Sequence, residues 1–209
     1  MSRKKIKLFP EIKKQIKTFL KQDIEDDRLM LLNPLIRLLK DKIKLNENIK
    51  LNFICTHNSR RSQFSQIWAK TAAHYFGYDV ETFSGGTEVT ELNERVVASL
   101  LRTGFRLIEK GEINPYTFIF YSEDADPIVA FSKTIDDQIN PIENFIAVMT
   151  CDQAHESCPV VPGAQSRVLL SYEDPKIFDG TPEESSKYDE RSKQIAAEMF
   201  HLFSSIRPK

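Results

Sequence analysis

The segment Ile49-Lys50-Leu51-Asn52-Phe53-Ile54-Cys55-Thr56-His57-Asn58-Ser59-Arg60-Arg61-Ser62 decides the fold of this 209-residue chain. Residues 49–54 are mostly apolar and alternating, which predicts a β-strand. After the polar residues, apolar side chains recur at helical spacing, at Ile67, Trp68, Ala72, Tyr75 and Phe76. Gly77 then predicts the end of this helix. A strand that passes through a short loop into a helix is typical of an open α/β sheet, with Cys55 at the carboxyl end of the first strand.

The loop after this strand carries a thiol and, six positions later, an arginine. Unpaired N–H groups and the dipole of the following helix stabilise negative charge, which favours both a Cys55 thiolate and a bound dianion. The planar guanidinium of Arg61 can hold two oxygens of such an anion. Ser62 is placed to donate a hydrogen bond to the thiolate, and Asn58 to brace the loop. The predicted oxyanion-binding loop consists of Thr56, His57, Asn58, Ser59, Arg60 and Arg61.

The other two cysteines, Cys151 and Cys158, lie on one segment. The run 145–149 before them predicts a buried strand, so Cys151 falls at or just past its carboxyl end, where open α/β sheets bind ligands. The two thiols are therefore expected near each other and near Cys55. Zinc is the competing interpretation, but two cysteines separated by six residues, with His155 between them and no second pair, give poor tetrahedral spacing.

Three features together resemble the thioredoxin-coupled arsenate reductases, relatives of the low-molecular-weight tyrosine phosphatases. They are the Cys55 loop, the Cys-x6-Cys-Pro segment 151–159 and Glu173-Asp174-Pro175, and the similarity covers roughly residues 49–206. The resemblance implies that Cys55 attacks arsenate, that Cys151 attacks Cys55 and releases arsenite, and that Cys158 takes over the disulfide. It also implies that a thioredoxin-type protein reduces the Cys151–Cys158 bridge. Asp174 matches the family's general acid.

Four positions depart from the family pattern. His57 stands where the family usually has a small residue and Arg60 replaces a second loop cysteine, so we expect a more cationic and more crowded pocket. Gln66 stands where the reductases often carry a glutamate associated with a potassium site, and we therefore predict no metal and no other cofactor. Lys176 stands where the phosphatases tend to place an aromatic residue that guides a phenyl ring, which favours a small inorganic anion.

Residues 1–48 lie outside the resemblance and predict a helical N-terminal extension, with helix starts at Pro10 and Pro34. Residues 1–50 hold 14 Lys and Arg against 7 Asp and Glu, whereas the remainder of the chain is acidic. Apolar stripes at helical spacing indicate packing on the domain or on a second subunit. Nucleic-acid binding is disfavoured, because aromatic and basic residues do not interleave as a stacking platform.

The remainder, residues 49–209, predicts one α/β catalytic domain with an open parallel sheet of about four strands flanked by helices. An insertion at about 112–135 reads as a β-hairpin, either an edge ribbon that shields the sheet or a lid or partner-binding flap near the pocket. Gly85-Gly86 predicts a tight turn, and Ser84 before it lies on the active-site edge, where we expect it to support Asn58.

Three functions remain open at this level. The first is a thioredoxin-coupled arsenate reductase, and the second is a phosphatase that hydrolyses phosphomonoesters through a phosphocysteine and needs only Cys55, Arg61 and Asp174. The third is a non-catalytic module that binds a phosphorylated ligand. The chain has no 18-residue apolar span and no signal peptide, and its odd number of cysteines points to a reducing cytoplasm without a membrane partner.

Overall fold

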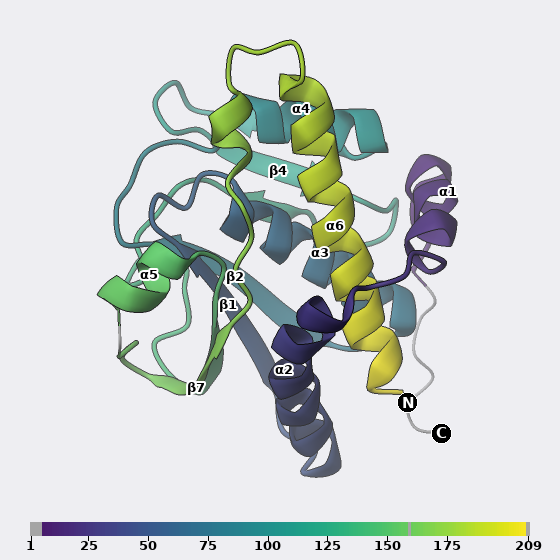
Figure 1. The fold of residues 1–209 in the computed structure, drawn as a ribbon, viewed down its shortest axis with the longest axis vertical. Coiled ribbons are helices and arrows are strands. Elements are labelled where there is room, and N and C mark those ends of the chain that lie inside the picture. Colours follow the sequence, from purple (N-terminus) through teal and green to yellow (C-terminus); the bar gives the residue numbers. More distant parts are fainter. Residues whose placement is uncertain (1–5, 159, 208–209) are drawn as a thin grey trace.

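The computed structural model describes residues 6–158 and 160–207, so the first five residues of the predicted extension and Pro159 of the cysteine segment lie outside it. It contains the predicted parallel sheet (Figure 1). The strands are β1 (Ile49–Cys55), β2 (Val80–Gly86), β6 (Phe145–Met149) and β7 (Ala164–Leu169), in the order β2-β1-β6-β7. All neighbouring pairs are parallel. The predicted place of the cysteine at the carboxyl end of the first strand is confirmed, because β1 ends on it.

Helices cover both faces of this sheet. α3 (Arg61–Phe76) and the long α6 (Glu184–Ser205) pack against each other on one face, and the short α5 (Asp152–Ser157) lies on the other. Ile146 and Val148 of β6 belong to the larger core, whereas the alternate residues of that strand belong to a second, smaller core. This division follows from the two-residue period of a strand, which sends successive side chains to opposite faces.

The N-terminal extension is helical, as predicted, and consists of α1 (Pro10–Phe19) and α2 (Asp26–Lys44). Figure 1 shows both helices beside α6, and their apolar side chains join the larger core. The predicted helix start at Pro34 is wrong, since Pro34 lies inside α2. The Pro34 ring is exposed. A proline removes one backbone hydrogen bond from a helix, and the burial of Leu32 and Leu35 on either side offsets this loss. Among the described residues, no helix is both long and apolar enough to cross a membrane.

The predicted hairpin insertion is confirmed and is part of a separate three-stranded antiparallel sheet. Its strands are β3 (Arg106–Lys110), β4 (Tyr116–Phe120) and β5 (Ile128–Ala130). β3 was not expected from the sequence, because four of its five residues are exposed and it lacks a buried face. α4 (Glu94–Thr103) leads into this sheet, and the helix ends at Gly104, which has a left-handed backbone conformation. The division of the chain at residue 48 stays a prediction, since one core runs across it.

Candidate active site

The sulfur of Cys55 lies 3.1 Å from the hydroxyl oxygen of Ser62, at the start of α3. That oxygen also accepts a hydrogen bond of 2.8 Å from the side-chain amide of Asn58. The Ser62 hydroxyl thus links the Asn58 amide to the Cys55 sulfur, and either the hydroxyl or the thiol can donate in the second contact. The contact places Ser62 where the sequence predicts it, and its role as a donor to a thiolate stays a prediction.

The carbonyl groups of the loop point outward. Those of residues 56–59 accept hydrogen bonds from the Glu88 N–H, the Ser132 hydroxyl, the Gln63 amide and the Asn93 N–H, in that order. Within the part of the chain that the structure describes, the backbone N–H groups of residues 57–60 donate no hydrogen bond. Since opposite ends of a peptide unit point in opposite directions, these donors face the inside of the loop and form an anion-binding concavity.

Asn58 holds the loop together and is completely buried. Its backbone has φ 46°, a left-handed conformation that asparagine tolerates better than most residues. Its side-chain oxygen accepts 3.1 Å bonds from the Gln63 side-chain amide and from the Lys133 backbone N–H. Gln63 also donates to the carbonyl of Phe131, which ties the end of the hairpin insertion to the loop. The bracing predicted for Asn58 is present, but Gln63 and Lys133 were not expected, since no local pattern marks either residue.

Gly86 brings β2 against the same loop. A Cβ atom there would lie 2.6 Å from the Thr56 carbonyl oxygen and 2.8 Å from the Asn58 nitrogen, so only glycine fits. The predicted tight turn at Gly85-Gly86 is wrong, because both glycines belong to β2. Ser84 on this strand is buried, but its hydroxyl donates to Gln66 at 2.6 Å rather than to Asn58.

A buried lysine lies behind the loop. Lys133 is 2% exposed, its ammonium nitrogen is 3.5 Å from the Ser84 hydroxyl, and it sits 4.6 Å from the centre of the Phe131 ring. Burial lowers its pKa to about 8, against the smaller opposing effect of Asp137. The structure thus places a cationic side chain beside Gln66 and Ser84, next to the residue that organises the oxyanion-binding loop.

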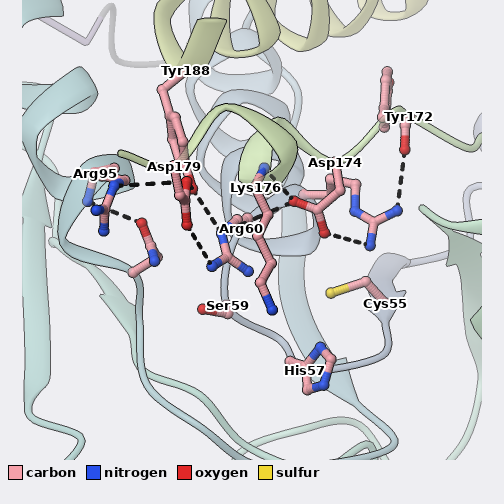
Figure 2. Close-up of polar contacts among 12 residues, drawn as sticks. Cys55, His57, Ser59, Arg60, Arg95, Tyr172, Asp174, Lys176, Asp179 and Tyr188 are labelled. Atoms are coloured by element: carbon pink, nitrogen blue, oxygen red, sulfur yellow. Dashed lines mark hydrogen bonds and ion pairs between the residues drawn. The ribbon is translucent and has the colours of Figure 1, made fainter. Parts of the chain in front are cut away.

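Arg61 and Asp174 meet at the mouth of the loop. The Arg61 guanidinium is 2.8 Å from a carboxylate oxygen of Asp174 and donates at 3.1 Å to the carbonyl of Tyr172. Asp174 precedes the short 3-10 helix η1 (Pro175–Phe178), and its carboxylate accepts a 3.0 Å bond from the Lys176 N–H there. In the view of Figure 2 the sulfur of Cys55 points towards the space bordered by Asp174, Lys176 and His57. The predicted nucleophile, anion-binding arginine and acid are therefore together in space.

The Arg60 side chain runs from the loop towards α6 and passes Asp174. Its Nε donates at 2.8 Å to the Tyr188 hydroxyl and lies 4.0 Å from Asp174, and its Nη2 lies 3.6 Å from Asp179 (Figure 2). Tyr188 in turn donates to Asp179 at 2.8 Å. The expected increase in positive charge from Arg60 is therefore offset by two carboxylates, and only its backbone belongs to the oxyanion-binding loop.

A cavity of about 670 Å³ opens beside the loop. It is lined by His57, Ser59, Arg60, Thr90, Glu91, Leu92, Asn93, Glu94 and Lys176, so it contains no Phe, Tyr or Trp. His57 lies at its rim, with its Nε2 3.3 Å from a carboxylate oxygen of Glu88. The cavity is larger than a tetrahedral oxyanion needs and offers charged rather than ring-stacking partners.

All three cysteines are free thiols. Cys151 is 1% exposed and caps α5, because its sulfur accepts from the Ala154 N–H at 3.4 Å. The same sulfur lies 3.6 Å from the hydroxyl of Thr56, the neighbour of Cys55 in the chain. Cys158, half-buried, ends α5 and packs against the small core that Cys55 and Cys151 share. Of the two predicted relay thiols, Cys151 thus contacts the loop, while Cys158 is one helix away.

Comparisons with known proteins agree with this geometry, although no family model matches the chain. It is 30% identical over 146 residues to an arsenate reductase of Bacillus subtilis, a match that spans 69% of this chain and 87% of the relative. An arsenate reductase of Halalkalibacterium halodurans is 27% identical over 132 residues, or 63% of this chain and 78% of that one. A low-molecular-weight phosphotyrosine phosphatase from Vibrio cholerae shares the fold, with a TM-score of 0.53 at 14% identity over 76% of this chain and 96% of its own. The chain therefore belongs to the arsenate reductase family and has the fold of the low-molecular-weight phosphotyrosine phosphatases.

Proposed function

We propose that this protein reduces arsenate to arsenite through Cys55, Cys151 and Cys158, and that a thioredoxin-type protein recycles it. The observation that carries the proposal is the 3.6 Å contact between the Cys151 sulfur and the Thr56 hydroxyl, which brings a second buried thiol to the residue next to the nucleophile. A phosphatase has no use for this thiol, because water completes its reaction.

In the first step the Cys55 thiolate attacks arsenic and one arsenic–oxygen bond breaks. The leaving group is a hydroxyl of the arsenate, which departs as water with a proton from Asp174, whose side chain is 27% exposed and can exchange protons with solvent. Arg61 and the inward N–H groups of residues 57–60 stabilise the charge that develops on the remaining oxygens. The product is a covalent Cys55–arsenic adduct.

The second step transfers two electrons. The Cys151 thiolate attacks the Cys55 sulfur, and the electron pair of the sulfur–arsenic bond stays on arsenic, which leaves as arsenite. A Cys55–Cys151 disulfide results. The Cys158 thiolate then attacks Cys151 and expels the Cys55 thiolate, and a thioredoxin dithiol reduces the Cys151–Cys158 bridge and is itself oxidised.

The last disulfide requires α5 to unwind. Cys151 and Cys158 stand at opposite ends of this helix. At about 1.5 Å rise per residue, seven residues along a helix separate two Cα atoms by roughly 10 Å. A disulfide needs the Cα atoms within about 7 Å. The relay therefore includes a conformational change of the segment Cys151–Cys158, which we call the redox segment.

A phosphomonoester phosphatase is the second candidate, and the 670 Å³ cavity favours it, since arsenate alone does not fill such a space. Its polar lining, which includes Lys176, suits a polar ester better than a phenyl ring. Both reactions would use Cys55, Arg61 and Asp174. Only the reductase would need the redox segment.

One experiment separates the candidates: turnover of arsenate with thioredoxin, thioredoxin reductase and NADPH, measured beside hydrolysis of an aryl phosphate by the same preparation. We expect NADPH oxidation that depends on arsenate. Aryl phosphate hydrolysis without arsenate-dependent NADPH oxidation would identify a phosphatase instead. Arsenate or phosphate binding without either turnover would identify a binding module.

A reducing compartment is part of the proposal. Three free thiols, two of them buried around one small core, serve the relay only while they remain reduced between turnovers. The bacterial and eukaryotic cytoplasm keeps thiols in this state, so we place the protein there.

A further inference from the structure

Arg28 reaches from the N-terminal extension to the chain segment that leads to Asp174. Its Nε and Nη2 each donate at 2.8 Å to one oxygen of the Glu198 carboxylate on α6. Its Nη1 donates at 2.8 Å to the carbonyl of Ser171, and the guanidinium lies 4.8 Å from the centre of the Tyr172 ring. A helix from outside the part of the chain that resembles the relatives thus contacts the approach to the proposed acid.

The carboxylate that Arg28 binds is 2% exposed and forms part of a closed network. Tyr172 donates its hydroxyl to Glu198 at 2.8 Å, and Gln194 donates to the same carboxylate at 3.0 Å. Burial, together with the negative charge of Glu198, holds the pKa of Tyr172 well above its ordinary value, so the hydroxyl remains a donor. A bidentate, buried pair of this kind fixes its partners in one geometry more than an exposed ion pair does.

The network ends at the catalytic side chains. Residues 170–174 belong to no helix or strand. Two backbone bonds, from the Leu170 N–H to Met149 and from the Tyr172 N–H to Thr150, hold the start of this segment, and side chains hold the carbonyl groups that follow. Arg28 holds the carbonyl of Ser171, and Arg61 holds the next carbonyl, that of Tyr172, at 3.1 Å. Two residues later Asp174 meets Arg61 at 2.8 Å. Two guanidinium groups, one from α2 and one from the oxyanion-binding loop, therefore grip consecutive peptide units just before the acid.

We propose that Arg28 is a positioning residue for catalysis: through Glu198, Ser171 and Tyr172 it holds Asp174 against Arg61, in the place from which the acid donates its proton. The N-terminal extension is then a working part of the active site rather than a separate appendage. This inference rests on the proposed role of Asp174 as general acid, although it holds for the reductase and the phosphatase alike.

The test is a double-mutant cycle of Arg28→Met and Asp174→Asn, measured as steady-state turnover of arsenate and, in parallel, of an aryl phosphate. We expect Arg28→Met alone to lower kcat about 10- to 100-fold, with KM changed by less than about threefold, because the anion-binding groups remain. In a protein that already carries Asp174→Asn, adding Arg28→Met should lower kcat by less than a further factor of about two, since the acid that Arg28 positions is gone. If Arg28 only holds the fold together, the two losses multiply, and this result would overturn the proposal.

Two further variants guard the interpretation. Arg28→Met leaves the buried Glu198 carboxylate without a cation, so the cycle is repeated with Arg28→Met and Glu198→Gln together, which removes both charges and protects the fold. Arg37→Met, an exposed arginine on the same helix, should change neither kcat nor KM by more than about twofold.

Hydrogen exchange gives a readout that does not depend on turnover. Arg28→Met should speed exchange of the amides of residues 170–174 by at least about tenfold while amides of β1 and β6 keep their protection, and Arg37→Met should not. If the unmodified protein turns over neither substrate, the proposed function fails, and this pattern alone decides the role of Arg28. If Arg28→Met speeds exchange equally in β1, β6 and residues 170–174, or does not change exchange at all, the positioning role of Arg28 is contradicted.

Discussion

The oxyanion-binding loop and the redox segment both carry essential thiols in the proposed reaction, yet they are built in opposite ways. In the loop, outside donors satisfy four consecutive carbonyl groups, and Asn58, Ser59 and Ser62 are buried. In the redox segment, all of which is described except its flanking Pro159, the helix α5 has six residues and buries the side chain of Ala154. The loop is fixed from several elements, whereas α5 rests on β1 and β6 through few contacts.

This difference fits two different demands. Stabilisation of a transition-state anion needs donors that are already in place, because their reorganisation would cost free energy at the moment of reaction. A thiol relay needs a segment that can change shape at low cost, because three sulfurs must meet in turn. The fold therefore holds the loop after Cys55 from several elements and holds α5 by fewer contacts, which is the arrangement that the proposed relay requires.

The largest effect is expected from Cys55→Ser. A serine hydroxyl is a far weaker nucleophile, so arsenate reduction and aryl phosphate hydrolysis should both fall by more than about 1,000-fold. Binding of phosphate, followed by calorimetry or tryptophan fluorescence, should stay within about threefold, because Arg61 and the inward N–H groups remain. Turnover that survives in this variant would remove Cys55 from the mechanism.

Substitutions in the redox segment should separate the two regions. Cys151→Ser and Cys158→Ser should each reduce arsenate turnover with thioredoxin to below about 1% of the unmodified rate, since a resolving thiol is missing. Aryl phosphate hydrolysis, if the protein has that activity, should stay within about threefold and serves as the internal control. An equal loss of both activities would instead show that these cysteines support the fold.

Asn58→Ala probes the rigidity of the loop. It removes the donor to Ser62 and the acceptor for Gln63 and the Lys133 N–H, and it puts alanine at φ 46°. We expect a loss of about 2–4 kcal/mol in the free energy of unfolding and a fall in kcat/KM of roughly 10- to 100-fold. Denaturant titration and steady-state kinetics measure the two effects.

Asn46 supplies the matched control for this variant, because it also has a positive φ, of 54°, but is exposed at the end of α2. Asn46→Ala should lower the free energy of unfolding by about 1 kcal/mol, the strain of alanine at a positive φ, and should leave kcat and KM unchanged. If the two variants behave alike, the hydrogen bonds of Asn58 do not matter for catalysis.

The last expected effect is a pH dependence of stability and concerns Lys133. Burial lowers its pKa to about 8 in the folded protein from an ordinary value of 10.5, so between these pH values the unfolded chain binds more protons. The free energy of unfolding should therefore rise with pH across this interval, by up to about 3 kcal/mol from this group. Lys133→Met should remove that rise, and denaturant titrations at pH 7 and pH 10.5 measure it.

Lys40→Met, at an exposed position of α2, provides the control and should keep the pH dependence of the unmodified protein. If the free energy of unfolding still rises with pH in Lys133→Met, the ammonium group of Lys133 is well solvated in spite of its 2% exposure.

The sequence predicts those parts of the molecule that depend on neighbours along the chain. The strand β1, the helix α3 with its end at Gly77, and the hairpin of β4 and β5 all follow from local periodicity and turn residues. The juxtaposition of Cys55, Arg61 and Asp174 follows from the same elements, because the carboxyl ends of parallel strands share one edge.

What the sequence does not predict depends on contacts between distant positions. Asn58 and Lys133 are 75 residues apart, and Arg28 and Glu198 are 170 apart, so no period or cap marks either pair. Gly86 looks like a turn residue, and only the approach of the Thr56 carbonyl explains why the strand ends in glycine. The sequence predicts that Arg60 adds charge to the pocket, but Asp179 and Tyr188, far along the chain, bind its guanidinium.

The most direct test of the relay is to map the disulfides after a single turnover. The reduced protein is mixed with excess arsenate and no thioredoxin, then alkylated, digested and analysed by mass spectrometry, with arsenite quantified in parallel. We expect about one arsenite per chain, a Cys151–Cys158 disulfide and an alkylated Cys55. Three alkylated cysteines with no arsenite, or arsenite formed while Cys151 and Cys158 both remain alkylated thiols, would contradict the relay.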